Sequence, residues 1–224
     1  MIPFIDIHTH KPTHKEGVLE VMSTFLQDIE LSREINSPFS TAIHPWHATG
    51  FSVLKVSEML EKVISQPNLK AIGETGLDKV CSADYQQQKL LFDMHIQFAE
   101  RYHKPLIIHV VKSWNDLLEH LKEPNIPIIL HGYSYRRLEL TRLLINKGFY
   151  FSLGKKVTFR EPDFCEVVRT IPLNALFLET DDTDIPIDQI YEETASILDI
   201  SSEDLKNQIL VNFTKLFGTT PESK

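Results

Sequence analysis

The stretch Phe4-Ile5-Asp6-Ile7-His8-Thr9-His10 decides how this chain is interpreted. Its apolar residues predict a β-strand that ends at the histidines. Because side chains two residues apart on a strand point to the same face, His8 and His10 are expected side by side at the strand end. Two imidazoles placed in this way form half of a metal site.

Four further potential metal ligands each follow a short apolar run that is typical of a strand. They are Glu74, His109, His131 and Asp181. Polar residues that recur at the carboxyl ends of strands, with helical segments between them, are typical of the mouth of a β/α barrel. The sequence therefore predicts an α/β fold of the TIM-type (β/α)8 barrel class.

The alternation of strand and helix patterns favours a parallel sheet. Strands are expected at 4–7, 18–25, 39–43, 70–73, 105–109, 127–131, 149–152 and 175–178, and helices at 52–65, 83–102, 112–122, 135–147, 160–169, 188–198 and 203–217. Between His10 and Phe39 there is little room for both a helix and a strand. We therefore expect a somewhat truncated or distorted barrel whose first helix is missing or vestigial, which leaves one side open to an oligomer contact.

The composition fits one barrel domain over residues 1–224, without repeats or linkers. No run approaches the ~20 apolar residues of a membrane span, so no membrane partner is expected. Two isolated cysteines fit a reducing cytoplasm. The net charge of −8 counts mildly against a dedicated nucleic-acid binder, although bound metals supply local positive charge.

Two motifs are expected to shape the pocket around these ligands. In Gly73-Glu74-Thr75-Gly76-Leu77-Asp78, the glycines allow a sharp turn beside a carboxylate that can bridge two cations. In His44-Pro45-Trp46, His44 is interpreted as a substrate or phosphate contact and Trp46 as an apolar wall. Lys112 is a further candidate contact for an anionic group. The competing interpretations are surface or core histidines, an ordinary turn and a solvated acidic loop.

Taken in order, these motifs resemble the TatD family of metal-dependent hydrolases, within the amidohydrolase superfamily. The resemblance is carried by Asp6-x-His8-x-His10, His44-Pro45, Gly73 to Asp78, Pro105 to His109, His131-Gly132-Tyr133-Ser134 and Glu179-Thr180-Asp181. It implies two divalent cations and deoxyribonuclease or phosphodiesterase activity, with DNA or another phosphodiester as substrate. It also implies ligand roles: His8, His10 and Asp181 for one metal, Glu74 as a bridge, and His109 and His131 for the second metal. His44 matches a position near the substrate phosphate.

The chain departs from the family pattern in two places that concern the substrate. Val110-Val111-Lys112 stands where an arginine is usual, and Asp182-Thr183-Asp184 replaces a small residue and proline. Added acidic residues are unexpected in a nuclease because they repel phosphates. These departures leave the metal chemistry intact and the substrate open.

The expected mechanism is hydrolysis assisted by two metals, with Asp181 as general base, Glu74 as bridging ligand and His44 stabilising developing charge. Mixed imidazole and carboxylate ligands suit Zn, Mn, Fe or Ni as well as Mg. One alternative keeps the metal site but acts on a non-nucleic-acid ester, lactone or amide. Others are a PHP-type phosphoesterase, which the Gly73 to Asp78 and Glu179 to Asp181 motifs disfavour, and a non-catalytic metal-binding barrel.

Overall fold

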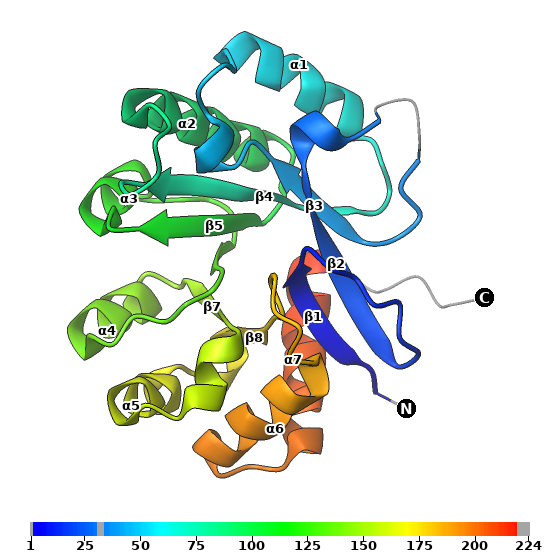
Figure 1. Ribbon diagram of the computed structural model, residues 1–224, viewed down its shortest axis with the longest axis vertical. Coiled ribbons are helices and arrows are strands. Elements are labelled where there is room, and N and C mark those ends of the chain that lie inside the picture. The colour runs from blue at the N-terminus through cyan, green and yellow to red at the C-terminus, as the bar shows by residue number, and fades with distance from the viewer. Residues whose placement is uncertain (1, 31–33, 219–224) are drawn as a thin grey trace. The chain divides into compact units, whose positions relative to one another are not determined.

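The computed structural model describes residues 2–30 and 34–218 (Figure 1). The strands are β1 (Phe4–Thr9), β2 (Val18–Phe25), β3 (Phe39–Ala42), β4 (Leu69–Asp78), β5 (Leu106–Val111), β6 (Ile128–Leu130), β7 (Tyr150–Leu153) and β8 (Leu176–Leu178). The α-helices are α1 (Val53–Val63), α2 (Tyr85–Arg101), α3 (Trp114–His120), α4 (Leu138–Asn146), α5 (Pro162–Thr170), α6 (Ile187–Leu198) and α7 (Ser202–Phe217). Within the described ranges, no helix is long and apolar enough to cross a membrane.

The eight strands form one sheet in sequence order, from β1 to β8. The pairs β2–β3, β3–β4, β4–β5, β5–β6 and β7–β8 are parallel. A parallel bridge between Thr9 and Asp181 joins the end of β1 to the segment after β8. This is the strand order of a TIM-type (β/α)8 barrel, so the predicted fold class is confirmed.

The chain divides into two compact units, which we describe separately. Unit 1 comprises Met1–Val21 and His131–Lys224, and unit 2 comprises Met22–Leu130. The expectation of a single domain over residues 1–224 stays a prediction.

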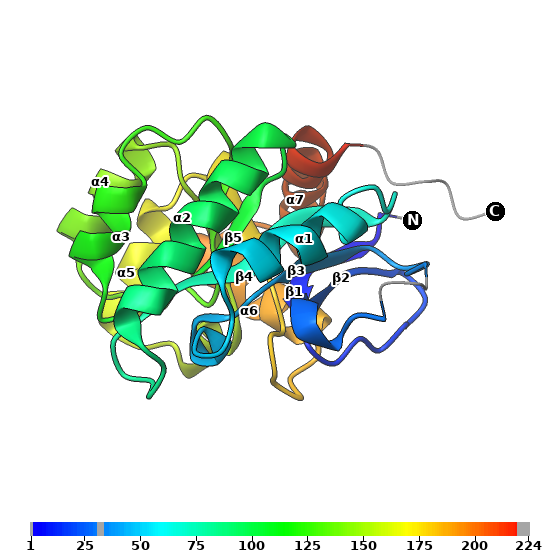
Figure 2. The same ribbon diagram turned by 90° about the horizontal axis from the view of Figure 1, so that it is seen from above.

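In unit 2, helices α1 and α2 lie side by side (Figure 2). The α2 helix begins after Asp84, whose carboxylate accepts a hydrogen bond from the Gln87 N–H at 2.7 Å. This N-cap satisfies a free donor of the first turn, so the helix starts two residues later than the sequence suggested. Phe92 and Ala99 are among its fully buried side chains, which pack into the core.

In unit 1, helices α6 and α7 contact β1. The buried Tyr191 of α6 fixes this packing, because its hydroxyl bonds both the N–H and the carbonyl oxygen of Ile5 at 3.1 Å. Burial raises the pKa of Tyr191 far above its ordinary value, so the hydroxyl stays protonated. The Tyr191 hydroxyl thereby fixes β1, the strand that carries His8, against α6.

The predicted loss of the first helix is confirmed. Residues 10–17, which connect β1 to β2, contain no helix. After β2 the structure has only the short 3-10 helix η1 (Leu26–Asp28) before the chain reaches residue 30. Residues 34–38, on the other side of the undescribed gap, also contain no helix.

The expectation that the Gly73 to Asp78 motif forms a turn is wrong. β4 continues through Asp78, with a shift in its register against β5 between Ile72 and Thr75. A Cβ atom on Gly73 would lie 2.6 Å from the Ile107 carbonyl oxygen, and one on Gly76 would collide with the backbone of His109. The glycines therefore allow a close approach of β4 to β5.

Candidate metal centre

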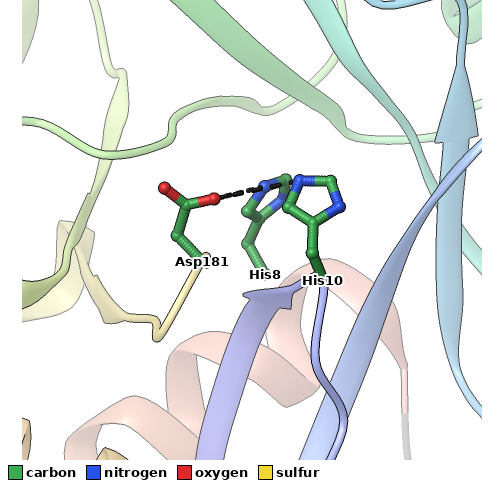
Figure 3. A group of neighbouring side chains, drawn as sticks. All are labelled: His8, His10 and Asp181. Atoms are coloured by element: carbon green, nitrogen blue, oxygen red, sulfur yellow. Dashed lines mark ion pairs between the residues drawn. The ribbon is translucent and has the colours of Figure 1, made fainter. Parts of the chain in front are cut away.

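The first candidate metal-binding group lies in unit 1 and consists of His8, His10 and Asp181, here called the β1–β8 group. Its ligand atoms lie within 4.8 Å of one another. The Nε2 atoms of His8 and His10 are 3.9 Å and 3.8 Å from the Asp181 Oδ1 atom (Figure 3). These distances are too long for hydrogen bonds. They suit three ligands around one cation, since metal–ligand bonds of about 2.0–2.2 Å place the ligand atoms roughly 3–4 Å apart.

Main-chain hydrogen bonds hold the β1–β8 group in place. The Asp181 N–H donates to the His8 carbonyl oxygen and the His10 N–H donates to the Asp181 carbonyl oxygen, both at 2.9 Å. Asp181 has a positive φ of 56°. Asp6 strengthens the junction, because its carboxylate accepts bonds from the Thr180 hydroxyl at 2.6 Å and the Thr180 N–H at 3.1 Å. Burial raises the pKa of Asp6 to about 7, against the opposing effect of the bonds from Thr180.

His131 also belongs to unit 1, where its ring lies 4.4 Å from the ring of His8. Its Nδ1 atom is 3.1 Å from the Oε1 atom of Glu179, which also accepts a bond from the Gly132 N–H at 2.7 Å. A proton on Nδ1 directed at the carboxylate leaves Nε2 as the ligand nitrogen. Glu179 is fully buried, and its Oε2 atom has no hydrogen bond within the described part of the chain. Such a carboxylate oxygen beside a histidine fits a cation nearby.

The second candidate group lies in unit 2 and consists of His44, Glu74 and His109, here called the β3–β5 group. The Glu74 Oε1 atom lies 3.1 Å from the His44 Nε2 atom and 2.8 Å from the His109 Nδ1 atom. Glu74 is 5% exposed, so this carboxylate contacts two imidazoles in a nearly dry environment. Buried charge of this kind requires partners, and a divalent ion is a strong one.

Asp78 supports the β3–β5 group from the end of β4. Its Oδ2 atom accepts a hydrogen bond from the Trp46 indole N–H at 2.7 Å and lies 3.2 Å from the His109 Nε2 atom. Burial opposes ionisation of Asp78, but hydrogen bonds from Trp46, the Val80 N–H and His109 outweigh it and lower the pKa. Asp78 is therefore a carboxylate that orients both the His109 ring and the Trp46 ring.

The hydrogen bonds of His44 indicate which nitrogen carries its proton. The Nδ1 atom accepts a bond from the Trp46 backbone N–H at 3.2 Å. In a neutral ring the proton then lies on Nε2, where it is donated to Glu74. A nitrogen that donates cannot ligate a metal at the same time, so this arrangement disfavours His44 as a metal ligand.

The acidic segment that follows Asp181 is paired with lysines. The Asp182 carboxylate lies 3.1 Å from the Lys155 ammonium, and the Asp184 carboxylate lies 3.0 Å from the Lys11 ammonium. The bond from Lys155 lowers the pKa of Asp182. Because each acidic side chain has a cationic neighbour, the segment repels a phosphate less than the sequence suggested.

The structure brings the sequence-predicted residues together within each unit. His8, His10, His131 and Asp181 are neighbours in unit 1, and His44, Trp46, Glu74 and His109 are neighbours in unit 2. Lys112 is exposed directly after β5, with a positive φ of 51°. The assignment of ligands to each metal and the bridging by Glu74 stay predictions.

Sequence reasoning missed Glu179 and Asp78 as the carboxylates that orient His131 and His109. Each lies inside a motif already singled out, Glu179 two residues before Asp181 and Asp78 four residues after Glu74, so an acidic residue close in sequence to a predicted ligand was the available signal. It also missed His95, whose contacts are described below. A histidine in the middle of a helix gives no such signal.

The family model for TatD related DNase matches residues 5–218. A protein named as an uncharacterized metal-dependent hydrolase from Buchnera aphidicola subsp. Baizongia pistaciae is 32% identical over 203 residues, which cover 82% of this chain and 75% of the relative. The uncharacterized metal-dependent hydrolase TatD of Mycobacterium tuberculosis is 32% identical over 152 residues, which cover 63% of this chain and 56% of the relative. The chain thus spans less than two thirds of that second relative.

Solved structures show the same fold. The TatD homologue YjjV of Escherichia coli K12 superposes with a TM-score of 0.82 at 23% identity, covering 98% of this chain and 100% of the other. A TatD family hydrolase of Entamoeba histolytica gives 0.76 at 18% identity, covering 97% and 99%. Fold, ligand groups and relatives together define a metal-dependent hydrolase. Within that class, the chain belongs to the TatD related DNase family.

Proposed function

We propose that this protein hydrolyses phosphodiester bonds, with DNA as the substrate class, and that it uses divalent cations bound at the β1–β8 and β3–β5 groups. The observation that carries this proposal is the presence of two groups in which imidazole and carboxylate ligand atoms lie within 4.8 Å of one another. The family match supports hydrolysis, and the description of that family supports DNA.

The residues fit the metals that the family implies. Mixed imidazole and carboxylate ligands suit Zn, Mn, Fe and Ni, and also Mg when carboxylates predominate. When bound, divalent cations lower the pKa of a water molecule and offset the charge of a phosphodiester. We propose His8, His10 and Asp181 as ligands in unit 1, together with His131, and Glu74 and His109 as ligands in unit 2.

The chain's own side chains supply the remaining chemistry. Asp181 is partly exposed, with 34% of its side chain accessible, and is proposed to accept the proton of the attacking water. His44 carries its proton on Nε2, and we propose that this N–H donates to the phosphate oxygens in place of Glu74 when substrate is bound, where it stabilises the charge that develops. Its ring is fixed for this purpose by the Trp46 N–H.

Trp46 is proposed as the wall of the substrate pocket. It is 57% exposed, yet its ring is fixed by the bond to Asp78 and by edge contacts with His44 and His109, at centroid distances of 4.7 Å and 6.0 Å. An exposed, rigid indole is a suitable stacking surface for a nucleobase. Lys112 is proposed as a contact for a neighbouring phosphate.

The proposal is tested with chelator-stripped protein and an end-labelled single-stranded DNA oligonucleotide. Mg²⁺, Mn²⁺, Zn²⁺ or Ni²⁺ is then restored, and the Asp181→Asn variant is the control. Metal-dependent cleavage that the variant loses supports the proposal. Absence of cleavage with every metal, in a protein that still binds divalent ions, contradicts the DNase assignment.

A second candidate function retains the metal site and changes the bond. It is hydrolysis of a non-nucleic-acid ester, lactone or amide, and the observation that favours it is Val110-Val111-Lys112 in place of the usual arginine. A screen that compares bis-p-nitrophenyl phosphate with lactones separates the two functions.

Two free cysteines, Cys81 and Cys165, support a cytoplasmic location in either case.

A further inference from the structure

A fully buried histidine lies in unit 2 outside the two metal-binding groups. His95 is on the inner face of α2, with an exposed fraction of 0%. A polar ring in such a place costs stability unless its nitrogens are hydrogen-bonded. The contacts of His95 therefore show what the ring does.

Both nitrogens of His95 contact groups on the sheet. The Ile43 backbone N–H donates to Nε2 at 3.3 Å, and Nδ1 lies 3.0 Å from the Thr75 hydroxyl. Because Nε2 accepts, the proton of the neutral ring is on Nδ1, where its partners are the Thr75 hydroxyl and the Leu91 backbone carbonyl. Burial lowers the pKa of His95 to about 3, which keeps the ring neutral near pH 7.

These two contacts lie next to two residues of the β3–β5 group. Ile43 directly precedes His44, and Thr75 directly follows Glu74. His44 and Glu74 meet through their Nε2 and Oε1 atoms at 3.1 Å. The His95 ring thus bonds to the Ile43 backbone next to His44 and to the Thr75 side chain next to Glu74.

The regular ladder between β3 and β4 does not extend this far. Its last registered pair is Thr41 with Ile72, and β4 shifts register between Phe39 and Ser40 of its partner strand. Beyond that pair, the Ile43 N–H is satisfied by His95 instead of by β4. Beyond the last β3–β4 pair, the His95 ring therefore connects the two chain segments that carry His44 and Glu74.

We propose that His95 is a positioning residue that sets the separation and orientation of His44 and Glu74. The inference rests on the proposed metal-binding and catalytic role of the β3–β5 group. His95 does not touch substrate or metal in this role. It acts through Ile43, directly after β3, and Thr75, within β4.

The test uses the full-length chain and two substitutions of His95. His95→Leu removes both hydrogen bonds, whereas His95→Gln keeps an acceptor for Ile43 and a donor for Thr75. Phe92→Leu is the matched control, because Phe92 is equally buried on the same helix. Mn²⁺ binding is measured by titration with electron paramagnetic resonance detection of free ion, in the Asp181→Asn background to isolate the β3–β5 group.

We expect His95→Leu to weaken Mn²⁺ binding by about 10- to 100-fold, as for loss of a residue that orients metal ligands. We expect His95→Gln to recover binding to within about threefold of the parent. In the chain with Asp181 intact, kcat of the Leu variant should fall with little change of KM. If Phe92→Leu weakens binding equally, or if His95→Leu binds like the parent, the proposal is overturned.

Two further arms keep the test decisive. Should His95→Leu fail to fold, the isosteric Thr75→Val variant removes one of the two bonds, and unchanged Mn²⁺ binding there also overturns the proposal. The binding measurement needs no substrate. A wild-type protein that binds Mn²⁺ but cleaves no DNA would therefore contradict the proposed DNase activity while leaving the role of His95 measurable.

Discussion

The two candidate metal-binding groups contain the same types of side chain but are held by different kinds of bond. In the β1–β8 group, main-chain hydrogen bonds fix Asp181 against His8 and His10, and the side-chain ligand atoms stand 3.8–3.9 Å apart. In the β3–β5 group, the side chains bond directly to one another through Glu74. A ligand of the first group can therefore be changed with little effect on its neighbours, whereas a change in the second leaves buried partners unsatisfied.

The largest effect is expected from Glu74→Ala. The variant loses a proposed metal ligand and leaves two imidazole nitrogens without their carboxylate, so activity should fall by more than about 10³-fold. Bound metal, measured by elemental analysis, should fall as well, and stability should drop by roughly 1–3 kcal/mol. Glu58→Ala, at an exposed site on α1, is the control. Full activity of Glu74→Ala would refute the bridging role.

Asp181→Asn should separate activity from stability. The proposed general base is lost, so kcat should fall by about 10²-fold or more. The main-chain bonds to His8 and His10 remain, and the melting temperature should stay within a few degrees of the parent. A large loss of stability in thermal denaturation would show that the β1–β8 group depends on its side chains after all.

Gly76→Ala tests whether the close approach of β4 to β5 supports the β3–β5 group. A Cβ atom there would collide with the His109 backbone, so we expect a loss of roughly 3 kcal/mol or more from strain and overpacking. Gly17→Ala is the control, because its φ is also positive but no atom lies within 4 Å of the added Cβ. It should cost roughly 1–2 kcal/mol. Equal losses in urea denaturation would show that only backbone strain matters.

Acid should destabilise unit 2 through His95. Its pKa is lowered by burial to about 3 in the folded protein, whereas an unfolded imidazole titrates near 6.5. The unfolded state therefore gains a proton first as the pH falls below about 6.5, and stability is lost progressively down to about pH 3. Between pH 7 and pH 5 the loss should be about 1–2 kcal/mol, and His95→Gln should lack it. If the free energy of unfolding of the parent and that of His95→Gln, both measured by urea denaturation, changed identically with pH, this account would be contradicted.

The smallest effect is expected from Asp182→Asn. The hydrogen bond from Lys155 is the main cause of the lowered pKa of Asp182. The pair therefore stabilises the protein at a pH above the ordinary Asp pKa, and this contribution is lost as the pH falls below that value. Exposed pairs contribute about 0–1 kcal/mol, and the change at pH 7 should be no larger. KM for a phosphodiester should change by less than about threefold, since Lys155 already offsets the charge. A tenfold lower KM would show that Asp182 repels the substrate.

The alternation of elements could be predicted from local patterns, because strand and helix periodicity is a property of neighbouring residues. The strand that ends in His8-Thr9-His10, and the absence of a helix over residues 10–17, were both readable in this way. The continuation of β4 through Asp78 could not be predicted from local patterns. The role of Gly76 depends on the backbone of His109, thirty-three residues further along the chain, and no local pattern contains that contact.

The proximity of the proposed ligands within each unit could be predicted for a related reason, and their roles as ligands stay predictions. His8, His10, His109 and Asp181 are placed by short strands whose ends are visible in the sequence. The residues that orient them could not be predicted with the same certainty. Glu179 and His131 are 48 residues apart, and His95 reaches Ile43 and Thr75 from the inner face of a helix. Such partners depend on the packing of one element upon another.

Unit 1 is assembled from two distant parts of the chain, Met1–Val21 and His131–Lys224. During synthesis, His8 and His10 leave the ribosome early, but Asp181 follows only after all of unit 2 has been made. The β3–β5 group, in contrast, lies within a continuous stretch that ends at Leu130. A nascent chain that has reached Leu130 therefore already carries every residue of the β3–β5 group, whereas the β1–β8 group lacks Asp181 until the chain is fifty-one residues longer.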